Sequence, residues 1–168
     1  LNFKSKYSYN DSTRTDFGNL NNDDTDGNSL ITEMTTGTGF IPIADYAGNF
    51  DGREHTIANI YINALEGDKT SKALIKNATK NASIMNLCVT GTVKSEWQAA
   101  GIVAYGVNNG EIKIINCINK ANITGKNMVG GIAASYMKII ENCTNYGNVE
   151  ITGSEYRICW YWGNNRSR

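Results

Sequence analysis

The sequence predicts an all-β protein folded as a parallel β-helix, that is, a β-solenoid. Three observations lead to this fold class: a short pattern recurs four times, apolar residues within each copy alternate with period two, and the composition suits strands and turns. A fixed period of about 20 to 50 residues is typical of stacked repeats. We therefore expect about four coils, right-handed because parallel strand connections usually have that hand.

The recurring pattern is an isoleucine, an asparagine two residues later, and two further positions that are apolar in the first two copies and hold cysteine and asparagine in the last two. Its four copies are Ile57–Asn59–Ile60–Ile62, Ile84–Asn86–Leu87–Val89, Ile114–Asn116–Cys117–Asn119 and Ile140–Asn142–Cys143–Asn145. Successive asparagines lie 27, 30 and 26 residues apart. A β-sandwich would also show many short strands, but it has no reason to keep one residue type at one place in every copy.

Two further apolar positions recur with the same spacing. Seven residues after the asparagine, the last three copies carry Val93, Ile123 and Val149. About sixteen residues after it come the pairs Leu74–Ile75, Ile102–Val103 and Ile132–Ala133. A single coil cannot bury its apolar face alone, so these positions predict a continuous core formed by stacking.

Within one copy the apolar residues follow the period of a strand. Leu87, Val89 and Val93 are expected to face the core, with Cys88 and Thr90 facing outward. Glycines at positions 91, 125, 147 and 153 separate the segments, as turn residues do.

The asparagine predicts a bend in each coil. Ile84 and Leu87 are three residues apart, so both face inward only if the chain turns at Asn86. Asparagine adopts left-handed backbone angles more readily than other residues that carry a side chain. We expect one such asparagine per coil, forming a structural ladder of stacked amides rather than a ligand site. Its members would be Asn59, Asn86, Asn116 and Asn142.

The four cysteines show no CxxC pair, and no zinc site is expected. Cys117 and Cys143 take the place that Leu87 holds in the preceding copy, so they are interpreted as small core residues. Stacked side chains run parallel instead of pointing at each other, which favours free thiols over a disulfide.

Charge and hydropathy exclude two classes of partner. Sixteen basic and sixteen acidic residues cancel and form no basic block, so nucleic-acid binding is not expected. Apolar runs stay far below the roughly 20 residues that span a bilayer, so no membrane insertion is expected within this segment. Because the chain starts at Leu1 instead of Met, we expect a fragment of a longer protein.

We divide the chain into three parts. Residues 1–38 form an irregular polar segment or cap, residues 39–156 the repeats, and residues 157–168 an aberrant tail. The tail is rich in aromatic residues where a glycine-rich element is due. Because the tryptophan codon read one base later encodes glycine before Tyr161 and Gly163, a frameshift would explain it. The rival interpretation is a genuine aromatic cap on the solenoid end.

Several stretches resemble the repeats of GLUG-motif proteins. The opening of that repeat is matched by residues 37–43 (GTGFIPI) and 50–62 (FDGREHTIANIYI), its GGIVG element by 101–104 and 130–134, and its NC.N.G.V element by 116–119 and 142–149. Departures are Arg53–Glu54 in the first turn and Ala134 in place of a glycine. GLUG-motif proteins are adhesin-like surface proteins of bacteria, and the repeat also occurs outside the catalytic part of IgA-specific metallopeptidases. The resemblance implies a β-solenoid with a binding, spacer or scaffold role.

From this resemblance we expect a non-catalytic repeat region of a bacterial cell-surface or secreted adhesin-like protein, without cofactor. Its partner would be a host protein or a glycan. The alternative is a scaffold segment of a larger surface enzyme, a metallopeptidase or a polysaccharide-active enzyme, with its active site outside this chain. The candidate ligand surface consists of Trp97 and Tyr105, because aromatic rings contact sugars and protein partners well.

One acidic stretch has the spacing of a calcium-binding loop. Asn22, Asp24, Asp26 and Glu33 alternate oxygen-bearing side chains as such a loop requires, and Gly27 would allow its sharp turn. Ser29 stands where an apolar residue normally anchors the loop, and neither flank reads as a helix. The other interpretation is therefore a solvated acidic loop.

Overall fold

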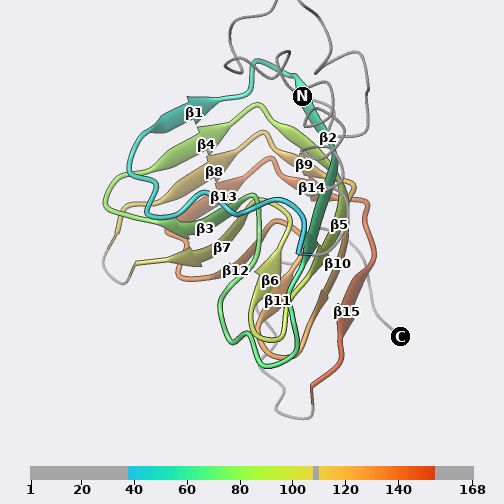
Figure 1. The fold of residues 1–168 in the computed structure, drawn as a ribbon. Helices are drawn as coiled ribbons and strands as arrows, with labels where there is room; N and C mark the ends of the chain where they lie inside the picture. The colour runs from blue at the N-terminus through green and yellow to red at the C-terminus, as the bar shows by residue number, and fades with distance from the viewer. Residues whose placement is uncertain (1–37, 108–109, 154–168) are drawn as a thin grey trace, which may run out of the picture.

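The computed structural model describes residues 38–107 and 110–153, and every regular element in them is a strand. No helix of this part is long and apolar enough to cross a membrane. The strands stack in parallel coils (Figure 1), which confirms the predicted β-solenoid. The predicted segments 1–38 and 157–168, including the proposed frameshift, lie outside the described residues apart from Thr38.

Each coil passes through four short sheets in a fixed order. Sheet 1 contains β6 (Ala99–Ala100) and β11 (Val129–Gly130). Sheet 2 contains β3 (Ile75–Ala78), β7 (Val103–Gly106) and β12 (Ala133–Ser135). Sheet 3 contains β1 (Asn49–Asp51), β4 (Ser83–Met85), β8 (Lys113–Ile115) and β13 (Ile139–Glu141).

Sheet 4 closes the coil and is the largest. It contains β2 (Thr56–Asn63), β5 (Cys88–Lys94), β9 (Ile118–Asn119), β10 (Asn122–Gly125), β14 (Thr144–Asn145) and β15 (Val149–Ile151). The long strand β5 pairs with both β9 and β10 of the next coil. All pairings between named strands are parallel, as one-way winding of the chain requires.

The chain passes sheet 3 four times, at β1, β4, β8 and β13. Four passages enclose about three complete turns between β1 and β13, because the intervals are one fewer than the passages. The repeat count predicted about four coils.

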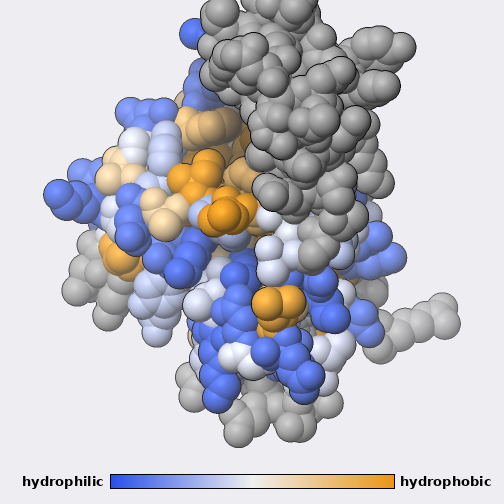
Figure 2. All heavy atoms as spheres, viewed as in Figure 1, coloured by the Kyte–Doolittle hydropathy of each residue, from blue (hydrophilic) through white to orange (hydrophobic). Residues whose placement is uncertain are grey.

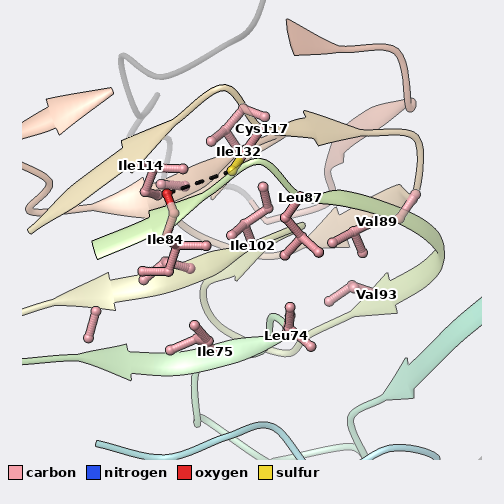
Figure 3. Packing of buried hydrophobic residues seen from close by; sticks show 14 of the residues in the cluster. Leu74, Ile75, Ile84, Leu87, Val89, Val93, Ile102, Ile114, Cys117 and Ile132 are labelled. Atoms are coloured by element: carbon pink, nitrogen blue, oxygen red, sulfur yellow. Dashed lines mark hydrogen bonds between the residues drawn. The ribbon is translucent and has the colours of Figure 1, made fainter. Parts of the chain in front are cut away.

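The core consists of apolar side chains stacked in columns (Figure 3). In sheet 3 one column runs through Phe50, Ile84, Ile114 and Ile140, which are register partners. In sheet 4 the predicted Val93, Ile123 and Val149 are register partners, and in sheet 2 the same holds for Ile75, Val103 and Ala133. The predicted inward direction of Leu87, Val89 and Val93 is confirmed, because all three are buried. Equivalent positions of successive coils pack closely on one another, and this buries apolar side chains that a single coil would leave exposed.

The bend between sheets 3 and 4 is made by one asparagine per coil. Asn86, Asn116 and Asn142 follow the last residues of β4, β8 and β13, with φ of 54°, 53° and 51°. This left-handed conformation turns the chain and lets the apolar residues on both sides face the core. Asparagine tolerates it better than other residues with a Cβ, so the predicted role of these residues in the bend is confirmed.

The first copy of the pattern is displaced, and the prediction for Asn59 was wrong. Asn59 also has a positive φ of 59°, but it lies inside β2. Ile57 pairs with Val89 and Ile60 with Gly91, so β2 carries one extra residue, a β-bulge. The Asn59 backbone N–H donates to Thr90 Oγ1 at 3.0 Å across this bulge. A left-handed asparagine between two inward apolar residues thus serves a bulge here and a corner in later coils.

The N-terminal end of the solenoid is covered by the chain itself. Gly39 forms an antiparallel bridge with Ile62, and Phe40 N donates to Tyr61 O at 2.7 Å. Further along, Ile43 and Tyr46 form parallel bridges to β3. These contacts satisfy the edges of sheets 4 and 2, which would otherwise be open to pairing with another chain.

The surface is mostly polar. Figure 2 shows hydrophilic residues around a few apolar ones on one face of the molecule. The exposed large hydrophobic residues of the described part are Ile41, Ile43, Leu65, Trp97, Tyr136, Ile139 and Tyr146.

Candidate functional site

An exposed column of side-chain amides runs along the corner between sheets 3 and 4. Asn116 Nδ2 donates to Asn86 Oδ1 at 3.2 Å, and Asn86 Nδ2 donates to Asp51 Oδ1 at 2.9 Å. The bond from Asn86, together with one from the Arg53 backbone, lowers the pKa of the Asp51 carboxyl. Asn142 holds the equivalent place in the next coil, since Glu141 pairs with Ile115. Asp51 therefore occupies the end of the column that the sequence assigned to Asn59.

This column predicts a difference between two substitutions at Asn116. Both Asn116→Ala and Asn116→Gly remove the amide that bonds to Asn86, but only alanine is disfavoured at the φ of 53°. Alanine should therefore lower the free energy of unfolding by about 1 kcal/mol more than glycine. Urea denaturation of the two variants measures the difference. Equal losses would show that the backbone conformation at this corner carries no strain.

A second amide column lies inside the solenoid, and sequence reasoning missed it. In sheet 4 the buried Asn119 is the register partner of Val89, and the buried Asn145 is the register partner of Asn119. Asn119 Nδ2 donates to Asn145 Oδ1 at 2.7 Å and to Ala121 O at 3.0 Å, while its Oδ1 accepts from Ala121 N at 3.1 Å. In the NCxN pattern the first asparagine is thus exposed and the second is buried. The sequence did carry a signal for the inner column, because an asparagine recurs three residues after the corner asparagine in both of the last two copies.

Glycines make room for this inner column. A Cβ at Gly101 would lie 2.3 Å from Asn119 Oδ1, and one at Gly131 would lie 2.3 Å from Asn145 Cγ. The glycines of the glycine-rich elements therefore lie against the amides of the NCxN elements. The amides of the inner column are bonded to each other and to the backbone, whereas the bonds of the outer column link the side chains of Asn116, Asn86 and Asp51.

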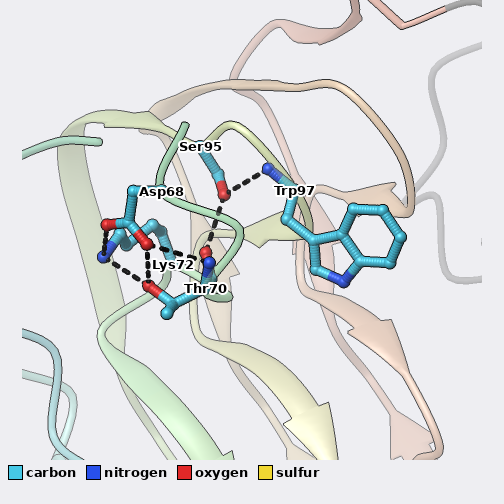
Figure 4. A network of polar contacts seen from close by, with 5 residues as sticks. All are labelled: Asp68, Thr70, Lys72, Ser95 and Trp97. Atoms are coloured by element: carbon cyan, nitrogen blue, oxygen red, sulfur yellow. Dashed lines mark hydrogen bonds and ion pairs between the residues drawn. The ribbon is translucent and has the colours of Figure 1, made fainter. Parts of the chain in front are cut away.

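Trp97 is held by a polar network that links two coils (Figure 4). Its backbone N–H donates to Ser95 Oγ at 3.0 Å, and Ser95 Oγ donates to Thr70 O at 3.1 Å. Thr70 Oγ1 donates to Asp68 Oδ1 at 2.6 Å, and Lys72 Nζ lies 2.8 Å from Asp68 Oδ2. The network fixes the backbone, while the Trp97 ring points away from it and is 36% exposed.

The same network predicts sensitivity to acid. Hydrogen bonds from Lys72 and then Thr70 lower the pKa of Asp68 to about 2 from an ordinary value of 3.8. Because the folded-state pKa is the lower one, the carboxylate contributes stability above about pH 4, and this is lost as the pH falls toward 2. The parent should thus lose more free energy of unfolding between pH 4 and pH 2 than Asp68→Asn does. Urea denaturation across this range checks it, and parallel pH profiles would contradict it.

Tyr105 forms an aromatic pair with Tyr136, away from Trp97. Their ring centroids are 5.4 Å apart in an edge-to-face arrangement. Tyr105 belongs to β7 of sheet 2, whereas Trp97 lies between β5 and β6, so the two members of the predicted ligand surface stand at different places around the coil. Tyr136 is 53% exposed and has a φ of 54°, which is unusual for an aromatic residue. In the same sheet Asn77 pairs with Tyr105, and Asn77 Nδ2 donates to Asp45 Oδ1 at 3.0 Å.

Cys88, Cys117 and Cys143 are free thiols. Cys117 is fully buried, while Cys88 and Cys143 are half-buried. Within the described ranges, no three metal-binding side chains gather at one place. The calcium candidate Asn22, Asp24, Asp26 and Glu33 lies outside these ranges.

The fold defines the class: the chain is a β-solenoid repeat protein. It is similar to halomucin of Haloquadratum walsbyi, with 31% identity over 124 residues. This match covers 65% of the chain but about 1% of the length of halomucin. No family model and no solved structure matches the chain.

Proposed function

We propose that this chain is a non-catalytic repeat region of a cell-surface or secreted adhesin-like protein, of the GLUG-motif type, and that it acts as a stiff spacer with a side surface for binding. The observation that carries the proposal is the parallel stacking of coils around one continuous core. Such a solenoid extends by adding coils, so it suits repeat regions of long proteins. Similarity to about 1% of the length of halomucin fits a segment of a much longer protein.

The alternative proposal is a scaffold segment of a larger surface enzyme whose active site lies elsewhere. Both proposals place the chain outside the cell, and they are distinguished by what the purified segment binds. An antibody against residues 38–153 should label intact cells that produce the protein or detect it in the culture medium. Labelling only after lysis, with none of the protein in the medium, would contradict a surface or secreted location and with it both proposals.

For the binding role we propose the pair Tyr105–Tyr136 as the contact surface. Tyr105 lies between Tyr136, its ring partner, and Asn77, its register partner, whose Nδ2 donates to Asp45 Oδ1, so aromatic area and polar groups lie along one face of the coil. This combination suits a glycan, because sugar rings present C–H groups to aromatic faces and hydroxyls to carboxylates and amides. A host protein is the other candidate partner.

A glycan array tests this surface with matched variants. The parent, Tyr136→Ala and Trp97→Ala should all keep their melting temperature within a few degrees, since both side chains are exposed. Loss of binding in Tyr136→Ala alone supports the surface in sheet 2. Loss of glycan binding in Trp97→Ala alone would show that Trp97, and not Tyr136, contacts the glycan. If the parent binds no glycan, only the spacer role remains as the proposal.

A further inference from the structure

Cys117 and Cys143 occupy the same position in consecutive coils. The partners that flank them fix this register, because Ile115 pairs with Glu141 and Ile118 with Thr144. Neighbouring strands lie about 4.8 Å apart, which falls within the range of Cα separations that a disulfide spans. Each thiol points toward the preceding coil, where Cys117 Sγ donates to Ile84 O at 3.7 Å and Cys143 Sγ donates to Ile114 O at 3.4 Å. Cys143 Sγ also accepts a hydrogen bond from Cys117 N at 3.4 Å, so it lies against the backbone of its partner, and closure requires the Cys117 side chain to rotate toward it.

The two thiols differ in exposure and in acidity. Cys117 is fully buried, and its hydrogen bond with Cys143, followed by burial, raises the pKa of its thiol. The interaction with the Cys117 side chain lowers the pKa of the Cys143 thiol, and Cys143 is half-buried. Thiolate is the reactive form of cysteine, so an external reagent should react first with Cys143.

We infer that Cys117 and Cys143 are a redox pair that closes into a disulfide between two coils when the protein meets a small-molecule disulfide. This site is independent of the proposed binding role, because it lies at the corner between sheets 3 and 4 and not in sheet 2.

The disulfide forms in two successive thiol–disulfide exchanges. The Cys143 thiolate attacks the small disulfide, forms a mixed disulfide and releases one small thiolate. The Cys117 thiol then gives its proton to solvent and attacks the Cys143 sulfur, which releases the second small thiolate. The protein dithiol is oxidised to a disulfide, and the small disulfide is reduced to two thiols.

Tryptic mapping of the full chain after treatment with oxidised glutathione tests the inference. Each cysteine lies on its own peptide, Cys117 on residues 114–120 and Cys143 on residues 139–157, whereas Cys88 lies on 81–94 and Cys159 on 158–166. We expect a linked species of 114–120 with 139–157 that dithiothreitol separates. A stable glutathione adduct on Cys143 of the parent, or links that involve only Cys88 or Cys159, would overturn the inference.

Two variants assign the order of the steps. In Cys117→Ser the first exchange proceeds but the second is impossible, so the glutathione adduct should accumulate on Cys143. In Cys143→Ser the buried Cys117 should stay unmodified. Preferential glutathionylation of Cys117 in that variant would contradict the assignment of Cys143 as the entry point. Circular dichroism of each variant confirms that the fold is kept.

Discussion

Replacing Gly91 with alanine should lower the free energy of unfolding by about 4 kcal/mol, among the largest losses expected from one substitution. Gly91 lies in β5 opposite the bulge in β2, with a φ of 129°. A Cβ there would lie 2.0 Å from Ile60 O and 2.5 Å from Ile60 N. Because the obstacle is backbone inside a paired strand, relief requires the first coil to move away from the second.

Gly67→Ala is the matched control. Gly67 also has a positive φ, 82°, but a Cβ there would meet nothing within 4 Å. Its substitution should therefore show the conformational penalty alone, about 1 kcal/mol. Urea denaturation of both variants separates the penalty of the backbone angle from that of the coil contact. Similar losses for the two would contradict the close approach of β2 and β5.

The second large effect is expected for Asn119→Ala, at about 3 kcal/mol. The substitution removes the partner of Ala121 N, of Ala121 O and of Asn145 Oδ1, all in buried surroundings. A buried polar group left without a partner costs about 1 to 3 kcal/mol, and the three losses are not fully additive because the chain relaxes.

Asn122→Ala provides the comparison for this residue type. Asn122 lies in the neighbouring strand β10, is exposed, and accepts one hydrogen bond from Asn148 N at 3.2 Å. Removing an exposed bond of this kind should change the free energy of unfolding by less than about 1 kcal/mol. Thermal or urea denaturation checks both variants. If Asn122→Ala lowers the free energy of unfolding as much as Asn119→Ala does, the inner column stabilises the fold no more than an exposed hydrogen bond does.

Much of this architecture could be predicted from the spacing of apolar residues. Val93, Ile123 and Val149 recur seven residues after an asparagine, and the structure places them in register. Such positions are predictable because a solenoid buries only what repeats in every coil. The corner asparagines were also predictable, since an inward residue on each side of one position requires a bend.

The first coil could not be predicted, for a physical reason. Ile57, Asn59 and Ile60 match the corner pattern, but a bulge places the same demands on the chain as a corner does: a left-handed residue between two inward ones. The inner column was missed because Asn119 and Asn145 hold the place of Ile62 and Val89 in the pattern, and a polar side chain alone gives no sign that the position stays buried. Their burial depends on glycines about fourteen to eighteen residues away, which no local pattern reveals.

The candidate binding surface could be predicted only in part. Tyr105 is an aromatic residue of sheet 2 with a ring partner, but its partner is Tyr136 of the next coil and not Trp97. Side chains of successive coils come into contact when their residues are register partners or when one residue is next in sequence to the register partner of the other. The sequence distance between Trp97 and Tyr105 is short, yet the chain passes through sheet 1 between them.

Equivalent residues of successive coils lie directly over one another. Methyl NOE spectroscopy with isoleucine labelling can measure this stacking on the column Ile84–Ile114–Ile140, in which Ile84 and Ile114 are buried and Ile140 is half-buried. We expect cross-peaks from Ile114 to both Ile84 and Ile140, and none between Ile84 and Ile140, which lie two strand spacings, about 10 Å, apart. A direct Ile84–Ile140 cross-peak, or the absence of both peaks to Ile114, would contradict the stacked-coil fold.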